Sequence, residues 1–145
     1  MIVDVMPTDP EILGFSNPWY SEAVATVSGV TLPSPKGEPF AIRIRLISAR
    51  CFVATKIEAF LGRGRNDFCA SHDIEDIVTI VNGRREITQE IGDDAYSLFV
   101  ARTFRDWLAL PRFPEALEGH LSEQGRWNTV LRRFKAVAAK CDKPR

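Results

Sequence analysis

The order of its hydrophobic patterns is the feature of this 145-residue sequence that most constrains the fold. Patterns typical of β-strands lie at residues 2–6, 26–32 and 40–47, whereas helical patterns dominate after residue 48. The third strand alternates isoleucine and leucine with arginine, which indicates one solvated face. Separate blocks of strands and helices are typical of α+β proteins. We therefore expect an α+β fold in which a short mixed sheet packs against a C-terminal helical segment.

Length and composition indicate one ordinary globular domain. Hydrophobic residues make up 45% of the chain and charged residues 26%, which excludes a disordered or fibrous design. We predict a single domain of residues 1–145, with a strand-rich part at 1–47 and a helical part at 48–145. Nineteen basic residues balance nineteen acidic ones, so any site for an anion must be local.

Cysteine usage and hydropathy argue against a disulfide framework, a zinc site and a membrane anchor. The three cysteines are an odd number without metal-ligand spacing, and the two histidines lie far apart in the sequence. The first residues show no basic segment before an apolar stretch, and no apolar run approaches the roughly 18 residues that span a bilayer. We expect a cytoplasmic protein with no membrane partner.

Two helices carry clear signals at their ends. We expect Ser48 to be the N-cap of a helix over 49–63, which glycines end. Ser71 caps a second helix that ends near Gly83, with acidic residues in its first turns. Further helical patterns cover 84–91, 93–109 and 126–140, and prolines at 111 and 114 break the chain between the last two.

On the first of these helices, Lys56, Ala59 and Arg63 form a row at positions i, i+3 and i+7. Lys56 falls inside the arc of the apolar stripe, and the other two lie near its edge. A small residue between two cations suits phosphate oxygens, because lysine acts as a point charge and arginine binds with two donors. The alternative is that Lys56 lays its stem over the edge of the core and that Arg63 is a solvated residue at the helix end.

On the second helix, Asp73 and Asp76 lie side by side along the border of the buried stripe. They can accept from a sugar hydroxyl or orient Lys56, or they can simply stabilise the first turns of the helix. Asp4 stands between two valines in the first strand and points to the face opposite theirs. In an edge strand that is ordinary, whereas in a central strand the carboxylate would face a site and suit a metal ion.

The helical tail carries several arginines. They either form a basic face for RNA phosphates or are scattered surface charge. The residues are Arg102, Arg105, Arg112, Arg126, Arg132 and Arg133.

The two helix segments resemble the AbiEii/AbiGii-type toxin family of the nucleotidyltransferase superfamily. Residues 54–65 have the family's pattern of a lysine, an alanine three residues on and then an arginine, and 71–77 have its acidic Asp-x-x-Asp-hydrophobic segment. Residues 3–7 and 13–20 look like the strand that brings a third acid and the segment after it. The resemblance covers roughly residues 2–82.

The resemblance implies a truncated nucleotidyltransferase-like fold and a role for each matching residue. Lys56 would contact the triphosphate, Asp73 would support the lysine or the nucleotide, and Arg63 would line the same pocket. Asp76 would contribute to nucleotide binding, and Asp4 would be a catalytic carboxylate that binds metal. Such proteins transfer a nucleotide from an NTP to an acceptor, in some cases the end of an RNA, with Mg²⁺ held by acids.

One part of the family's pattern is missing. The Gly-Ser motif and the Asp-x-Asp pair that follows it should precede Asp4 and occur nowhere in the sequence. We therefore expect the isolated chain to be inactive, because Asp4 alone cannot hold two metal ions. The alternatives are a noncatalytic binding module, one that assembles with a second copy or another chain through the edge of the strand at 2–6, or a truncated reading frame without a selected function.

Overall fold

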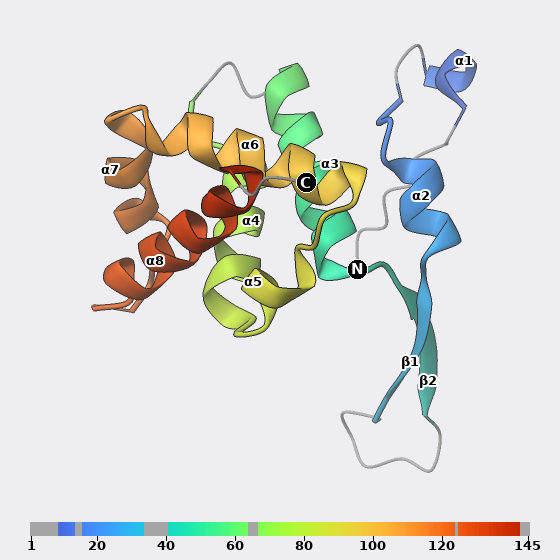
Figure 1. Ribbon diagram of the computed structural model, residues 1–145. Helices are drawn as coiled ribbons and strands as arrows, with labels where there is room; N and C mark the ends of the chain where they lie inside the picture. Colours follow the sequence, from blue (N-terminus) through green and yellow to red (C-terminus); the bar gives the residue numbers. More distant parts are fainter. Residues whose placement is uncertain (1–8, 14–15, 34–40, 64–66, 124, 143–145) are drawn as a thin grey trace.

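The computed structural model describes residues 9–13, 16–33, 41–63, 67–123 and 125–142 (Figure 1). The fold class is α+β, as the sequence predicts. The elements are α1 (Pro10–Leu13), α2 (Tyr20–Ala25), β1 (Ser28–Leu32), β2 (Ile42–Leu46), α3 (Ala49–Arg63), α4 (His72–Gly83), α5 (Ile87–Glu90), α6 (Ala95–Leu108), α7 (Arg112–Gly119), α8 (Trp127–Ala138) and the 3-10 helix η1 (Ala139–Asp142).

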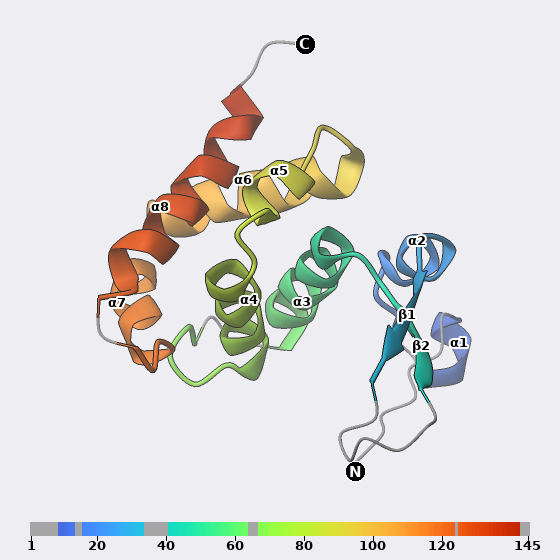
Figure 2. The ribbon, with the colours of Figure 1, turned by 90° about the horizontal axis from the view of Figure 1, so that it is seen from below.

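The core lies between the long helices. Helix α3 packs against α4 and α6, and α8 packs along α6 (Figure 2). The two predicted helix starts are confirmed, because the Ser48 hydroxyl accepts from the N–H of Cys51 and the Ser71 hydroxyl accepts from the N–H of Ile74. Such caps satisfy N–H groups that have no partner within the helix. They fix where α3 and α4 begin, and with that the positions of their charged side chains.

A cluster of aromatic rings anchors the loop between α3 and α4. Phe68 lies in this loop and is buried, with its ring centroid 5.1 Å from that of Phe60, 5.5 Å from Trp107 and 5.1 Å from Phe113. A ring nitrogen of His120 also lies 2.6 Å from the backbone carbonyl oxygen of Phe68. Burying a phenylalanine side chain contributes about 1.5–3 kcal/mol. The loop is thus held to the body of the protein from both its side chain and its backbone.

The sheet differs from the prediction. In the described part of the chain it consists of β1 and β2, which pair antiparallel with Val30 opposite Ile44. The prediction of a mixed sheet is therefore wrong for the described residues. Figures 1 and 2 show this hairpin projecting from the helices and not lying across them. The helices bury their apolar faces against one another, so they leave the hairpin uncovered and Leu32, Ile42 and Leu46 stay 42–50% exposed. The expected strand at 2–6 lies outside the described residues.

Helix α7 is the second difference, because the sequence predicts a break there. Pro111 stands at its N-cap and Pro114 in its first turn. Neither position needs an N–H donor within the helix, so both prolines are compatible with a helix start. The carbonyl oxygen of Pro114 also accepts from the indole N–H of Trp127, which ties α7 to α8.

The other predicted helices are present with shorter bounds. The patterns at 84–91, 93–109 and 126–140 correspond to α5, α6 and α8. None of the helices in the described ranges combines the length and the hydropathy that crossing a membrane requires.

Candidate functional site

The row predicted on α3 faces the start of α4. Lys56 lies two turns before the end of α3, and its side chain is 25% exposed. Its ammonium nitrogen lies 3.3 Å from Oδ1 of Asp73 and 2.5 Å from Oδ2 of Asp76. The same nitrogen lies 5.7 Å from the centre of the Phe52 ring, within the range of a cation–π contact. Lys56, on α3, therefore forms ion pairs with two aspartates of α4.

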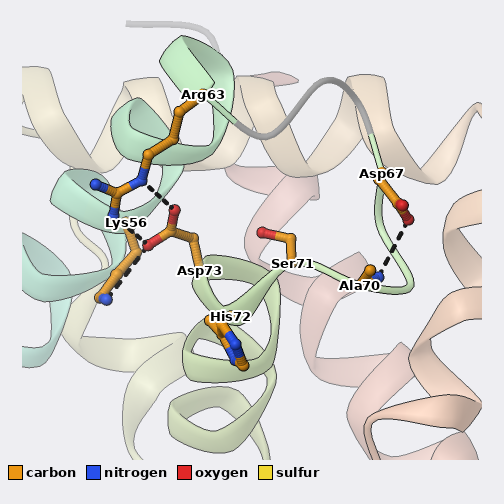
Figure 3. A pocket seen from close by; sticks show the side chains of 7 residues that line it. All are labelled: Lys56, Arg63, Asp67, Ala70, Ser71, His72 and Asp73. Atoms are coloured by element: carbon orange, nitrogen blue, oxygen red, sulfur yellow. Dashed lines mark hydrogen bonds and ion pairs between the residues drawn. The ribbon is translucent and has the colours of Figure 1, made fainter.

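Asp73 is the centre of the cluster. Its side chain is 7% exposed, and both carboxylate oxygens accept hydrogen bonds from Arg63, through Nε and Nη2, at 3.2 Å each. Figure 3 shows this carboxylate between the arginine and the lysine. An aspartate in the first turn of a helix is also favoured by the helix dipole. A buried carboxylate with two cationic partners is satisfied electrostatically, which explains why it is tolerated there.

The pKa shifts reflect these contacts. Burial by itself lowers the pKa of Lys56, but the hydrogen bonds and charges of Asp76 and Asp73 together outweigh it, and the pKa is raised above its ordinary value. The hydrogen bond to Asp73 raises the pKa of Arg63 as well, against a smaller opposing effect of burial. Both side chains are therefore cationic at neutral pH. Two cations and two acids leave this group of four residues without net charge.

A hollow of about 480 Å³ opens beside the cluster. Lys56, Arg63 and Asp73 form one side, and the loop before α4 forms the other (Figure 3). The loop is shaped by Asp67, whose carboxylate accepts from the backbone N–H groups of Cys69 and Ala70. The lining residues are Lys56, Arg63, Asp67, Ala70, Ser71, His72 and Asp73.

The structure brings together four of the predicted site residues, namely Lys56, Arg63, Asp73 and Asp76. Asp4, the predicted catalytic and metal-binding carboxylate, lies outside the described residues. The alternative prediction for Arg63 is a solvated residue at the helix end, and its side chain is 65% exposed. It nevertheless donates two hydrogen bonds to Asp73. The sequence does not show that these residues meet, because the contact depends on how α3 packs on α4.

Sequence reasoning missed the residues of the connecting loop. Asp67 lines the hollow, and an aspartate two to three residues before the N–H groups that it binds is a recognisable turn signal. Ser71 also lines the hollow, although its predicted role is only that of a helix cap. His72 lines the hollow too, but it points away from Asp73 in Figure 3 and its Nδ1 lies 3.1 Å from Glu75. That fits a surface contact.

The described residues do not offer a magnesium site. Asp73 and Asp76 are both bound to cationic side chains, which is unsuited to a second cation. No group of three or more metal-ligating side chains is found within the described ranges.

Two arginines of the helical tail have structural partners. Arg133 donates to the backbone carbonyl oxygens of Val81 and Asn82, and Arg126 donates to the side chain and backbone of Asn82. These carbonyls lie at the end of α4, where cations stabilise the helix. Arg126 and Arg133 therefore serve to dock α8 on α4, which weakens the interpretation of the tail as a basic face for RNA.

Comparisons of the chain with family models, with curated proteins and with solved structures found no significant match. The resemblance to the AbiEii/AbiGii-type family therefore stays a prediction from the sequence.

Proposed function

We propose that the hollow beside Lys56 and Arg63 binds the phosphates of a nucleotide, in a nucleotidyltransferase-like protein of the toxin–antitoxin type. One observation carries the proposal, namely that two cations from one helix converge on a buried carboxylate at the wall of an open hollow. A hollow of about 480 Å³ lies within the size range of small-molecule sites, roughly 300–1,000 Å³.

Donor accounting supports binding of an anion here. A lysine ammonium has three N–H donors, and Lys56 contacts two carboxylates. A guanidinium has five, of which Arg63 uses two on Asp73. The remaining donors suit phosphate oxygens, for which arginine supplies a planar fork and lysine a point charge. Asp73 holds both cations in place before a ligand arrives, so less conformational entropy is lost on binding.

The resemblance supplies the reaction that we propose, which this chain would perform only with acids supplied by another chain, because it lacks the Asp-x-Asp pair. A hydroxyl oxygen of the acceptor, such as an RNA end, attacks the α-phosphorus of an NTP. The bond from that phosphorus to the bridging oxygen breaks, pyrophosphate leaves, and the hydroxyl proton passes to solvent. Lys56 and Arg63 would neutralise charge on the triphosphate, while Asp73 and Asp76 would orient the lysine. Mg²⁺ would supply charge neutralisation on the phosphates, and acids other than Asp73 and Asp76 would have to hold it, with Asp4 as the predicted candidate from this chain. We propose a cytoplasmic location for this activity.

Titration with inorganic tripolyphosphate tests the phosphate site without a nucleoside. We expect binding to the wild type, followed by calorimetry, and a loss of about tenfold or more in affinity for Lys56→Met and for Arg63→Met, because each removes charge-assisted hydrogen bonds. Lys135→Met is the matched control, since Lys135 is exposed on α8, away from the hollow. Wild-type protein that shows no binding at millimolar tripolyphosphate would overturn the proposal.

The hairpin favours a second candidate function, that of a noncatalytic assembly module. Val30, Leu32, Ile42, Ile44 and Leu46 share one face of the hairpin by their register, and three of them are 42–50% exposed. A two-stranded hairpin is marginally stable when its apolar face is not covered. Packing of this face against the hairpin of a second copy would cover it. Light scattering over a range of concentrations tests this. We expect a dimer that Leu32→Thr/Ile42→Thr dissociates, and a concentration-independent monomer would refute it.

A further inference from the structure

A second hollow lies on the other side of the α3 row. Its volume is about 370 Å³, and Asn17, Tyr20, Glu58, Ala59, Gly62 and Arg63 line it. Arg63 also lines the hollow of Figure 3, so one residue borders both. A ligand whose charged end lies at Lys56 and Arg63 can therefore extend over the surface of α3, toward α2, into the second hollow.

The walls of the second hollow differ chemically from those of the first. Among the described residues that line it, Arg63 is the one cation and Glu58 the one carboxylate. The Glu58 carboxylate accepts hydrogen bonds from hydroxyl and amino groups. Tyr20 is half-buried and offers an aromatic ring. This combination suits a neutral group that carries O–H or N–H donors and a flat ring.

The floor of the hollow is open because its residues are small. Ala59 and Gly62 lie on α3, one turn apart. A Cβ atom added at Gly62 would meet no described atom within 4 Å beyond its neighbours and the backbone of its own helix. A flat group can thus approach the helix closely at Gly62, where any larger residue would occupy the space.

The wall opposite α3 is fixed in position. The buried side chain of Asn17 donates to the backbone carbonyl oxygen of Thr55 on α3 at 2.8 Å, and its Oδ1 accepts from the N–H of Trp19 at 3.1 Å. The Trp19 ring packs on Phe99 with centroids 5.1 Å apart. These contacts hold the start of α2, and therefore Tyr20, at a set distance from α3. A site with a preset width loses little entropy on binding.

We infer that this second hollow is a nucleoside subsite, which takes the base and ribose of the nucleotide whose phosphates lie at Lys56 and Arg63. The base lies against Tyr20 and the face of α3 at Gly62, and Glu58 accepts from a ribose hydroxyl or a base amino group. The inference rests on the proposed function, because that function places the phosphates. It adds the orientation of the ligand, with the phosphates in the first hollow and the nucleoside in the second.

Gly62→Leu tests the subsite by filling it. Leucine has a much higher helix propensity than glycine, so the variant should unfold at the same or a higher temperature than the wild type. Gly83→Leu is the matched control, because Gly83 also lies at a helix end with no described atom within 4 Å of an added Cβ and lines neither hollow. Tyr20→Ala removes the ring as a second, independent variant.

The ligands are tripolyphosphate, ATP and adenosine. We expect wild type to bind ATP about tenfold more tightly than tripolyphosphate, as stacking of one base provides. Gly62→Leu and Tyr20→Ala should remove that difference and leave the affinity for tripolyphosphate unchanged, and adenosine should bind to the wild type and not to Gly62→Leu.

The outcomes separate the two proposals. If tripolyphosphate fails to bind but adenosine binds in a Gly62-dependent way, the phosphate site is wrong and the nucleoside subsite stands. If Gly62→Leu leaves the affinities for ATP and adenosine unchanged, the subsite is wrong and the phosphate site is unaffected. A short oligoribonucleotide whose binding depends on Gly62, with no such dependence for ATP, would assign the hollow to the acceptor strand and overturn the inference.

Discussion

Replacing Lys56 by methionine measures how much the charge cluster contributes to stability. Methionine keeps an unbranched, apolar stem against Phe52 and removes the ammonium group. In the structure that group contacts Asp73 at 3.3 Å and Asp76 at 2.5 Å. The variant therefore removes one side of two ion pairs with little change in packing.

The magnitude follows from the exposure of the two acids. Asp76 is 44% exposed, so its pair with Lys56 is worth no more than about 1 kcal/mol. Asp73 is buried, and a hydrogen bond to a charged group contributes about 1.5–3 kcal/mol. The cost of burying part of the ammonium offsets some of this gain, and Arg63 remains bound to Asp73. We expect a net loss of about 1–2 kcal/mol, or roughly 2–8 °C in Tm.

The pH dependence of this loss is set by the raised pKa of Lys56. A lysine whose pKa is higher in the folded state stabilises the fold fully below its ordinary pKa of about 10.4, and the contribution is lost as pH rises through the folded value. The difference between wild type and Lys56→Met should therefore be constant between about pH 7 and pH 9 and shrink in more alkaline solution.

Urea unfolding followed by circular dichroism measures the effect, with the slope m compared between variants. Lys135→Met, on the exposed face of α8, should change the free energy of unfolding by less than about 0.5 kcal/mol. A Lys56→Met variant as stable as wild type, or more stable, would refute the energies assigned to the pairs. It would mean that the cost of burying the ammonium cancels its attraction to both acids.

Three further substitutions test the supports of the site. Phe68→Ala should lower the free energy of unfolding in urea by about 3–5 kcal/mol, because it removes a buried ring from the aromatic cluster. A loss below about 0.5 kcal/mol, as for an exposed side chain, would contradict the anchoring of the loop. Asn17→Ala should cost about 1–2 kcal/mol and weaken ATP but not tripolyphosphate binding in calorimetry, since it frees the loop before α2; equal weakening of both ligands would oppose the separate subsites. Arg133→Met should lower the unfolding free energy by about 1–2 kcal/mol through the end of α4 and leave tripolyphosphate binding unchanged; a loss of binding would indicate that α8 belongs to the site.

Several elements follow from local sequence alone. The bounds of α3 and α4 agree with the predicted caps at Ser48 and Ser71, because a cap acts on N–H groups only two or three residues away. Helix α7 shows the limit of such signals. Proline reads as a breaker, and only its place within the first turn decides whether it begins a helix or ends one.

The hairpin shows a different limit. Alternation of apolar and basic residues predicts a strand over 40–47, of which 42–46 is a strand in the structure, and it predicts which side chains share a face. It does not predict what covers the apolar face, because that depends on where the helices pack. In the structure the helices pack on one another, and the hairpin extends beside them.

The candidate site divides in the same way. Helical period placed Lys56 and Arg63 in one row of α3 and set Asp73 and Asp76 along one border of α4, since each set lies within a few turns of one helix. Only the packing of α3 on α4 brought the two sets into contact, since Lys56 and Asp73 are 17 positions apart in the sequence. The same packing, with the Asn17 anchor, made the two hollows that meet at Arg63. The periodic pattern of a sequence shows which face of its own helix a side chain occupies. Which residue it contacts depends on how the helices pack when the core is buried.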